Sequence, residues 1–458
     1  MARRTASPAI IALAAAGLTC STIPADAAPS QRRIHDVVRS PGGVARVSVS
    51  RTGEQANRGS GLQDTVPALS AHGRYVTFVS AASNLVPNDT NGVEDVFVRD
   101  RRTGRVLRAS VGPGGRQADD GSVDPSISAD GRLVAFTSVA RNLVAGDTNG
   151  VRDVFVRDLR RGTTRRVSVG AGGRPGAADS FFPVLSADGS AVAFQSFARL
   201  SPRDTNNAED IYVRDLRRGR TWRASLAPGR RQFSGPSALP SLSADGRRVA
   251  FVAEYRGPNH FEVWVHDRRT HRTRLVSVRQ RITEDNSVGR PSLSGNGRFV
   301  AFASSRTTLV PGDTNQARDV FVRDLATGRF RRVSVDVRGG QGNADSQAPA
   351  ISAGGRYVAF ASHATNLVAG DTNERSDVFL RDLATGALRR VSVPRSGEEA
   401  NDHSAFFNEL SLSADGRHVA FESVATNLVP ADTNRRPDVF VWDAPKRRGT
   451  WPAVGREG

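Results

Sequence analysis

One segment of twelve residues recurs seven times along the chain, and this repetition limits the possible folds more than any other feature. Its clearest copy is P-S-I-S-A-D-G-R-L-V-A-F at 125–136. The last residue of each copy is a phenylalanine, at Phe78, Phe136, Phe194, Phe251, Phe302, Phe360 and Phe421. Such a repeat indicates one small unit that buries its apolar surface against its neighbours. From the length alone we would expect roughly three domains of about 150 residues. The repeats instead predict seven similar units.

Each unit is predicted to contain four short strands, which we call a, b, c and d in chain order. Asp130 and Gly131 read as a two-residue hairpin turn between strands a and b, and glycine holds the second turn position in every copy, because that position needs φ > 0. In the second repeat the strands are expected at 125–128, 133–138, 153–158 and 165–169.

Strands b and c carry continuous apolar runs, such as VAF and VFV, in place of strict alternation. Such runs are typical of a sheet that is covered on both faces. Four-stranded sheets stacked radially, each between two others, are the blades of a β-propeller. The sequence therefore predicts an all-β, seven-bladed β-propeller with four-stranded blades. A flat solenoid is the alternative, and it would need polar caps at its ends.

The two ends of the repeat region complement each other. The last repeat has strands a, b and c but no strand d, since Pro445 and Pro452 oppose a strand there. The missing A-R-V-S-V segment lies at 45–49. We therefore expect the ring to be closed by an N-terminal strand that completes the last blade. The predicted organisation is a signal peptide (1–27), a flexible N-terminal segment (28–43), the propeller (44–443) and a C-terminal tail (444–458).

The first residues have the pattern of an export signal. Arg3 and Arg4 are followed by an apolar stretch at 10–18, and A-D-A at 25–27 predicts cleavage before Ala28. A lipoprotein anchor at Cys20 and a twin-arginine signal are the alternatives. No other segment approaches the roughly 18 apolar residues of a transmembrane helix. The mature protein is thus expected to be secreted or extracytoplasmic, soluble, monomeric and free of cysteine.

The chain is strongly basic, with 64 Lys and Arg against 46 Asp and Glu. Nearly all of this charge is arginine, since the only lysine is Lys446. Many arginines recur at strand positions, so we expect the charge to be spread around the ring. That distribution favours solubility and loose attraction to anionic surfaces over specific nucleic-acid binding.

The b–c and d–a connections of such blades share one face, and here they are the long ones, so we assign the binding face to them. The b–c loop carries N-L-V-x-x-D-T-N-x-x-x-D, and alternating oxygen ligands of this kind predict possible Ca²⁺ sites. The alternative is that the Asp and Asn side chains bond to their own backbone and shape the loop. The calcium candidates are Asp89, Asn91, Asp95, Asp147, Asn149, Asp153, Asp204, Asn206, Asp210, Asp313, Asn315, Asp319, Asp371, Asn373, Asp377, Asp432, Asn434 and Asp438.

The d–a loop ends in a second repeated polar element, just before the innermost strand. It could contribute a polar ring near the mouth of the channel, or it could only cap the loop and cover the next blade. The candidate binding-face residues are Asp119, Ser122, Asp179, Ser180, Asp345, Ser346, Asn401 and Ser404.

The fourth repeat departs from the others. Its b–c loop is short, Glu262 replaces the usual Asp, and His260, His266 and His271 lie close together in sequence. A notch or partner contact is preferred over a metal site, and simple sequence drift over both. The chain has no G-x-S-x-G, H-E-x-x-H or P-loop motif. We therefore predict no catalytic residue and, apart from possible Ca²⁺, no cofactor.

The unit S-A-D-G at 128–131 through D-L at 158–159 resembles the TolB-type, or WD-repeat-like, propeller repeat. The resemblance implies the fold, while related repeats occur in prolyl oligopeptidases and in sugar-active lyases, so it does not fix the activity. The resulting hypothesis is a secreted, non-catalytic scaffold that binds a protein, a peptide or an anionic cell-envelope polymer. The alternative is a propeller enzyme, a polysaccharide lyase or hydrolase, that acts at the channel mouth.

Overall fold

The computed structural model describes residues 43–61, 65–255, 257, 260–278, 288–405 and 410–445. The predicted signal peptide, nearly all of the segment at 28–43 and most of the C-terminal tail lie outside the described residues. Within them, no helix has the length and hydropathy needed to cross a membrane.

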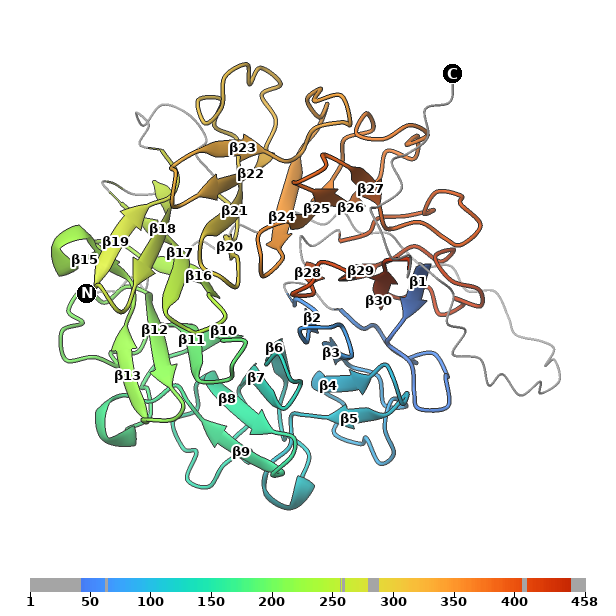
Figure 1. The fold of residues 1–458 in the computed structure, drawn as a ribbon. Coiled ribbons are helices and arrows are strands. Elements are labelled where there is room, and N and C mark those ends of the chain that lie inside the picture. The colour runs from blue at the N-terminus through green and yellow to red at the C-terminus, as the bar shows by residue number, and fades with distance from the viewer. Residues whose placement is uncertain are drawn as a thin grey trace, which may run out of the picture. The chain divides into compact units, whose positions relative to one another are not determined.

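Seven antiparallel sheets of four strands stand around a central axis as the blades of a propeller (Figure 1). This arrangement confirms the predicted fold and the predicted number of blades. The strands of blades 1 to 4, from the axis outward, are β2 (Ala68–Leu69), β3 (Tyr75–Ser80), β4 (Asp95–Asp100), β5 (Val106–Arg108); β6 (Ser122–Ile127), β7 (Leu133–Ser138), β8 (Asp153–Asp158), β9 (Thr163–Arg166); β10 (Ser180–Leu185), β11 (Ala191–Ser196), β12 (Asp210–Asp215), β13 (Arg220–Arg223); and β16 (Ser237–Leu242), β17 (Arg248–Glu254), β18 (Phe261–Asp267), β19 (Arg272–Leu275).

The remaining three blades follow the same order. Their strands are β20 (Ser292–Leu293), β21 (Phe299–Ser304), β22 (Asp319–Asp324), β23 (Phe330–Arg332); β24 (Ser346–Ile351), β25 (Tyr357–Ser362), β26 (Asp377–Asp382), β27 (Leu388–Arg390); and β28 (Leu410–Leu412), β29 (His418–Ser423), β30 (Asp438–Asp443), β1 (Gly43–Arg46). A small hairpin, β14 (Leu226–Ala227) with β15 (Arg231–Gln232), and the 3₁₀ turns η1 (Pro113–Gly115), η2 (Ala171–Gly173) and η3 (Pro228–Arg230) lie in the d–a loops.

The core consists of apolar layers between adjacent blades. Within blade 2, Phe136 and Phe155 stack at a centroid distance of 5.8 Å, and both are fully buried. They pack against Val79, Val96 and Val98, which project from blade 1. Each blade thus buries both of its faces, which explains the continuous apolar runs in strands b and c.

The ring closes between the two ends of the chain, as predicted. β1 pairs antiparallel with β30, with Val44 opposite Trp442, and the Val47 amide donates to the Val439 carbonyl at 2.8 Å. Blade 7 is therefore completed by the N-terminal strand.

Strand d lies earlier in the sequence than we predicted. In blade 2 it ends at Arg166, because the Ser168 hydroxyl replaces the next backbone acceptor and receives the Val154 amide at 3.0 Å. The following residues leave the sheet, and Val169 forms an isolated bridge with Pro175.

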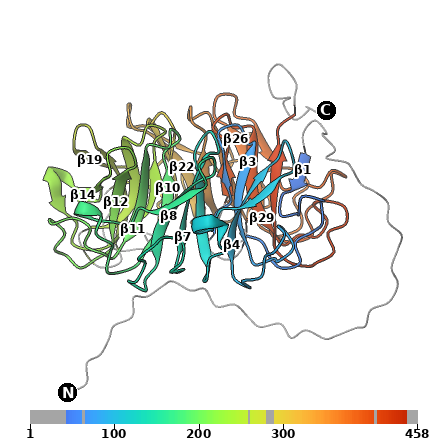
Figure 2. The ribbon, with the colours of Figure 1, turned by 90° about the horizontal axis from the view of Figure 1, so that it is seen from below.

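The a–b turns form a continuous ring of backbone hydrogen bonds on the opposite face from the long loops. One such bond runs from the Ala71 amide to the Ala129 carbonyl at 3.1 Å, and the last returns from the Ala414 amide to the Ala71 carbonyl at 3.0 Å. This close approach favours small residues: a Cβ on Gly295 would lie 2.9 Å from the Cβ of Ala353. Figure 2 shows the blades edge-on, with loops above and below the strands.

The closure strand is expected to carry a large share of the stability of blade 7. Deletion of residues 44–50 should lower Tm sharply, since Val44 and Val47 are each 2% exposed and together represent about 3–6 kcal/mol of apolar burial. Scanning calorimetry measures the effect, and Arg51→Ala at an exposed position is the control. A Tm unchanged by the deletion would contradict ring closure by this strand.

Candidate functional site

The carboxylates of the b–c loops meet at an arginine from strand d. In blade 2, Arg166 Nη1 lies 2.8 Å from Asp147 Oδ1 and 2.9 Å from Asp153 Oδ2. The Ser168 hydroxyl donates to the other oxygen of Asp153, and Asn149 Nδ2 donates to Asp153 at 2.8 Å. All of the Asp residues predicted as calcium ligands lie in such clusters. The six arginines with their Asp pairs are Arg46 with Asp432 and Asp438, Arg108 with Asp89 and Asp95, Arg166 with Asp147 and Asp153, Arg223 with Asp204 and Asp210, Arg332 with Asp313 and Asp319, and Arg390 with Asp371 and Asp377.

The amide side chains of the same motif bond to backbone groups of the next loop. Asn149 Nδ2 donates to the Gly176 carbonyl at 3.0 Å, and the equivalent bonds in the other blades have the same form. The remaining amides are Asn91, Asn206, Asn315, Asn373 and Asn434, which donate to the carbonyls of Ala118, Phe233, Gly342, Ala400 and Ala56. The motif therefore ties each b–c loop to the d–a loop that follows it.

The electrostatics of these clusters are those of buried ion pairs. Burial raises the pKa of Asp371 to about 6, and repulsion by Asp377 adds to the shift while Arg390 opposes it. The guanidinium supplies the positive charge that two adjacent buried carboxylates require. Among the residues that the structure describes, no group of three or more His, Cys, Asp or Glu side chains is placed to hold a metal ion. The calcium hypothesis stays a prediction. The loop-shaping alternative predicted bonds to the loop's own backbone, such as those that Asn373 and Asn434 accept from the amides two residues later at 2.9 Å. The contacts between the Asp residues and the strand-d arginine were not part of that prediction.

In blade 4, the buried carboxylate receives its counter-charge from a neighbouring blade. Leu275 stands where the other blades have the strand-d arginine, and Glu262 replaces Asp. The fully buried Arg306 reaches Glu262 from blade 5, with contacts of 2.8 and 3.1 Å. The position of Arg306 holds alanine in blades 1, 2, 3, 6 and 7, for example Ala140 and Ala198, and it holds Tyr255 in blade 4. The arginine has thus moved across the boundary between blades 4 and 5.

The three histidines of the fourth repeat do not form one cluster. His260 lies 3.7 Å from Glu262, whereas His266 bonds to Thr273 at 2.9 Å near the other end of β18. His260 and His266 are six residues apart in sequence, which corresponds to about 20 Å along an extended strand. Burial lowers the pKa of His266 to about 4. The ring of His271 lies 6.4 Å from that of His266.

The candidate binding-face residues of the d–a loops are bonded within the fold. The four serines are fully buried, and each pairs with a serine at the end of strand b, as Ser122 does with Ser138 at 3.0 Å. The other pairs are Ser180 with Ser196, Ser346 with Ser362 and Ser404 with Ser423. Asp119, Asp179 and Asp345 accept backbone amides of Arg141, Arg152 and Arg318 at 2.8–2.9 Å, and Asn401 donates to Thr426 at 2.8 Å. Their role in ligand binding stays a prediction.

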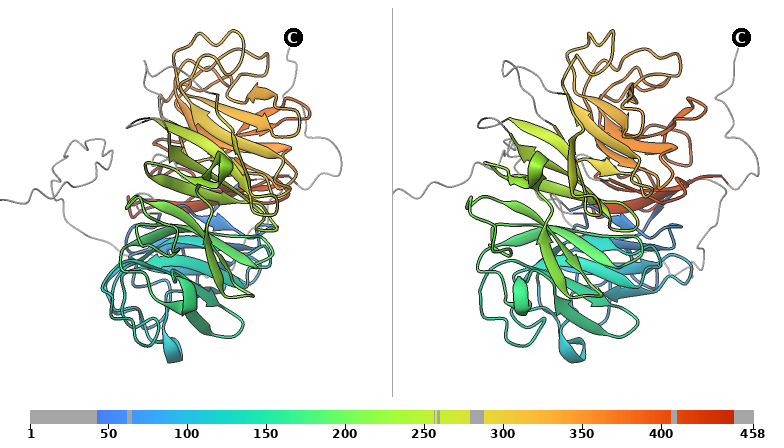
Figure 3. Two further views of the ribbon diagram at one scale, coloured as in Figure 1. Left: turned by 90° about the vertical axis from the view of Figure 1, so that its left-hand side faces the viewer. Right: turned by 60° about the vertical axis from the view of Figure 1, so that its left-hand side comes forward.

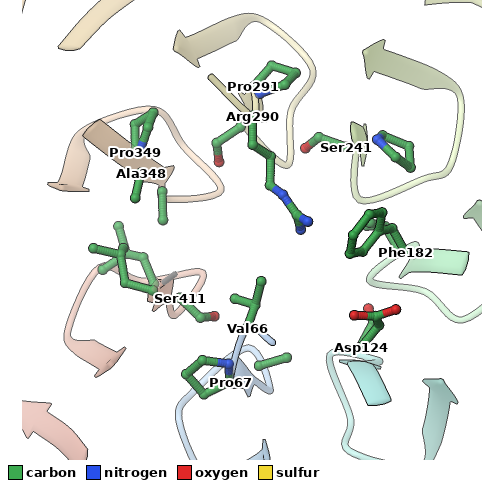
Figure 4. Close-up of a pocket in the computed structure, with 18 of the residues that line it drawn as sticks. Val66, Pro67, Asp124, Phe182, Ser241, Arg290, Pro291, Ala348, Pro349 and Ser411 are labelled. Atoms are coloured by element: carbon green, nitrogen blue, oxygen red, sulfur yellow. The ribbon is translucent and has the colours of Figure 1, made fainter. Parts of the chain in front are cut away.

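A central cavity of about 230 Å³ lies between the innermost strands (Figure 4). Strand a contains a proline at the same position in most blades. The wall of the cavity consists mainly of this proline and the residues on either side of it, for example Asp124, Pro125 and Ser126 in blade 2. The residue after the proline is serine in several blades and links neighbours: Ser126 Oγ accepts the Leu185 amide at 3.0 Å. This part of the wall is therefore a structural ring.

The residue before the proline differs from blade to blade. Strand a contains a bulge there, and the backbone is left-handed at Asp124, Phe182, Leu239 and Ala348, with φ of 53°, 50°, 57° and 51°. Left-handed non-glycine residues are strained and often mark functional positions. The bulge turns Asp124, Phe182 and Ala348 toward the channel axis. Leu239 instead packs against an apolar core cluster.

Three of these variable side chains form a polar and aromatic group in the channel. The guanidinium of Arg290 lies 5.2 Å from the ring centroid of Phe182, and Figure 4 shows Arg290 and Asp124 pointing into the same space. Burial raises the pKa of Asp124 to about 6, while Thr137 and Arg290 act in the opposite direction.

An aromatic path joins this group to the loop face. Phe182 packs edge-on against Phe181 at 5.2 Å, and Phe181 contacts Phe197 at 6.0 Å. The Phe197 side chain is 40% exposed. Blade 3 thus presents a partly exposed aromatic surface from the b–c loop down to the channel.

The sequence contains signals for the strand-d arginine clusters and for the channel group, neither of which was predicted. The strand-d arginine occurs in every repeat that has the Asp pair, and it is absent only where Glu262 stands. The channel residues occupy the one position of strand a whose charge and size change between otherwise similar copies, from Asp124 to Phe182 to Arg290.

Solved structures with similar folds are β-propellers. An oligogalacturonate lyase in complex with manganese matches with a TM-score of 0.52 at 14% identity, over 89% of this chain and 95% of that chain. An oligogalacturonate lyase from Vibrio parahaemolyticus matches with a TM-score of 0.53 at 13% identity, over 88% of this chain and 94% of that chain. TolB from Acinetobacter baumannii matches with a TM-score of 0.37 at 22% identity, over 58% of this chain and 53% of that chain. This chain thus spans about half the length of that TolB.

No family model and no curated protein matches the chain. At these identities the solved structures establish the fold alone. The seven four-stranded blades confirm the predicted propeller.

Loss of one strand-d arginine should be strongly destabilising. Arg166→Leu leaves Asp147 and Asp153 buried without their counter-charge, and we expect a loss of about 3–5 kcal/mol in the free energy of unfolding. The arrangement in blade 4, where an arginine from the next blade neutralises the carboxylate, suggests a second substitution that should restore this stability. In the background D147N/D153E/R166L, adding Ala198→Arg should restore stability, because Ala198 matches the position of Arg306.

Denaturant titrations compare these variants. The matched control adds Ala198→Arg to the otherwise unchanged protein, where a second buried cation should destabilise. If Ala198→Arg is equally harmful in both backgrounds, the inferred exchange between blades is wrong.

Chelator treatment separates the two interpretations of the Asp loops. We expect EDTA to leave Tm unchanged, because each Asp pair already contacts a guanidinium. A fall in Tm that added Ca²⁺ reverses would instead support calcium sites in these loops.

Proposed function

We propose that this protein is an exported, non-catalytic binding scaffold whose ligand sits at the channel mouth on the b–c and d–a face. The observation that carries the proposal is the contrast between repeated and non-repeated polar residues. The repeated Asp, Asn and Ser side chains bond within the fold, whereas Asp124, Phe182 and Arg290 differ from their counterparts and converge on one cavity. A rigid frame with a variable centre is the arrangement expected of a ligand-specific propeller.

The chemistry of this site favours a peptide or protein segment. Phe181, Phe182 and Phe197 offer aromatic contact area, and Arg290 and Asp124 offer charges of opposite sign for a ligand's polar groups. Aromatic and arginine side chains are the usual anchors of such interfaces. The A-D-A cleavage pattern at 25–27 supports export, which would present this face outside the cytoplasm.

The second candidate is a polysaccharide-acting enzyme in the channel. Asp124 favours it, since a pKa near 6 suits a general acid or base. Along the described part of the cavity wall, however, Asp124 is the only carboxylate. Glycoside hydrolysis ordinarily uses two. Binding therefore explains the described site with fewer additional groups.

Ligand capture tests the binding proposal. The wild-type protein and the double variant F182A/R290A are immobilised and exposed to extract of the native cell envelope. We expect a component retained by the wild type to be lost at least tenfold in the variant, because its aromatic and cationic contacts are removed. The control variant R51A/R58A changes exposed arginines away from the cavity. Equal retention by all three proteins would contradict the proposed site.

The same preparations are incubated with polygalacturonate and followed by the ultraviolet absorbance of unsaturated products or by reducing ends. Turnover that Asp124→Asn abolishes would support the enzyme in place of the scaffold.

The raised pKa of Asp124 should make the thermal stability of the protein depend on pH. Its folded pKa of about 6 lies above the value of about 3.9 in an unfolded chain, so the folded state holds the extra proton between these values. The stability contributed by this protonated group is therefore present below pH 4 and lost as pH rises through 6. Asp124→Asn should match wild-type Tm near pH 4 and exceed it increasingly up to about pH 7. A pH-independent difference in Tm would contradict the raised pKa.

A further inference from the structure

Among the described residues, the face opposite the loops carries exposed arginines on only part of its rim. This rim is formed by the c–d turns, which are the outer connections of the blades on the side of the a–b turns. Exposed arginines occur there in blades 1 to 4 and become rare in blades 5 and 6. They are Arg102 and Arg105; Arg160 and Arg161; Arg217, Arg218 and Arg220; Arg269 and Arg272; and, in blade 5, Arg329 alone. We call the set from blades 1 to 4 the arginine arc.

The turns themselves show that the arc is not required for folding. Blades 2 and 3 have Arg160-Arg161 and Arg217-Arg218 before the turn glycine, whereas blade 5 has Ala326-Thr327 and blade 6 has Ala384-Thr385 at the same place. The glycine has φ of 68° in blade 2 and 76° in blade 5. The same turn therefore forms with or without two positive charges.

The nearby acidic residues neutralise the arc only in part: Arg161 lies 3.9 Å from Asp158, and Arg218 lies 3.6 Å from Asp215. The Asp at the end of strand c is bound by an arginine of the a–b turn: Arg74 lies 2.7 Å from Asp100, and Arg132 lies 2.6 Å from Asp158. In blade 3, where Ser190 replaces that arginine, Asp215 accepts the backbone amides of Arg217 and Arg218 at 2.9 and 2.8 Å.

The Asp residues of the a–b turns are also engaged. Asp130 and Asp245 accept hydroxyl hydrogen bonds from Ser128 and Ser243 at 2.6 Å. The outer c–d turns thus keep an excess of positive charge.

The arc deepens between blades 3 and 4 into a cleft of about 470 Å³. Its walls include Arg217, Arg218, Arg247 and Arg269, and Figure 3 brings these two blades to the front. Arg268 lines it as well. Burial lowers the pKa of Arg268 to about 10, so this guanidinium is still charged at neutral pH. The cleft therefore gathers five arginines around two carboxylates, Asp215 and Asp245. Arg247 is already paired with Asp267 at 2.6 Å, so the other four arginines supply the excess positive charge.

We propose that the arginine arc binds an acidic polysaccharide that lies along the rim of blades 1 to 4, with the cleft between blades 3 and 4 as its main contact. Guanidinium groups pair with carboxylates through two parallel hydrogen bonds, which suits a polymer that presents one carboxylate on each successive sugar. Four consecutive charged blades fit an extended chain better than one small anion.

The arc offers little to a nucleic acid beyond charge. Base recognition in single strands relies on aromatic side chains that stack on the bases. The aromatic side chain beside the cleft, Trp222, is covered by the guanidinium of Arg268, which lies 3.9 Å from its ring centroid. This surface is also on the opposite face from the channel mouth, so the inference does not depend on the proposed function.

The test variant copies turns that the chain already contains. R160A/R161T/R217A/R218T gives blades 2 and 3 the Ala-Thr turn of blades 5 and 6, which should preserve the fold. Calorimetric titration with polygalacturonate is expected to show at least tenfold weaker binding by the variant than by wild type. The slope of log K against log salt concentration should also become shallower, because fewer ions are released. Neutral dextran is expected to bind neither protein.

A charge-matched control removes four exposed arginines from the d–a loops. R51A/R58A/R116A/R174A lowers the net charge by the same amount as the test variant and should retain binding within twofold. Equal losses in the two variants would show that net charge alone acts, and no loss in the arc variant would exclude the arc. Single-stranded DNA of similar length is the competing probe. Tighter binding of DNA than of polygalacturonate, lost in the arc variant, would overturn the assignment to polysaccharide.

Discussion

Burial of each blade on both faces is the constraint on which this structure depends. The Phe136 and Phe155 pair of one blade needs the valines of the preceding blade, and each following blade repeats this need. A row of such blades leaves apolar faces uncovered at its ends unless polar caps cover them or its first and last members meet. Pairing of β1 with β30 meets this requirement, and the ring of backbone bonds between the a–b turns adds a second connection that does not depend on side-chain identity.

Inside this frame, the buried charges have a structural task. A guanidinium that bonds two carboxylates holds the start of strand c, the b–c loop and the end of strand d together, as Arg166 does with Asp147 and Asp153. Such ion pairs are not efficient sources of stability in comparison with apolar packing, but they become costly when one partner is missing. They therefore define the conformation of long loops that would otherwise have few restraints. This leaves the non-repeated positions, in the channel and on the outer rim, available for recognition.

The fold was predictable because it depends on features that are local in sequence or strictly repeated. The turn glycines, the apolar runs and the missing last strand identified the propeller and its closure. The end of strand d was misplaced, because propensity does not reveal that the Ser168 hydroxyl takes over a backbone acceptor. The arginine clusters were missed because a motif of oxygen ligands suggests a metal when the cation comes from a side chain 13 residues later, as Arg166 does for Asp153. The channel group was missed because Asp124, Phe182 and Arg290 lie far apart in sequence and meet only at the axis.

The exchange of partners between blades 4 and 5 has a consequence for how a repeat protein of this kind can change over evolutionary time. Repeats are commonly gained, lost or shuffled as single genetic units, and most blades here carry their own counter-charge and could be moved alone. Blade 4 cannot, since Glu262 depends on Arg306 from its neighbour. Separation of the two by recombination would leave a buried carboxylate in one product and a buried guanidinium in the other. Blades 4 and 5 therefore form a single heritable module, in contrast to blades such as blade 2, whose Asp pair and arginine lie within one repeat.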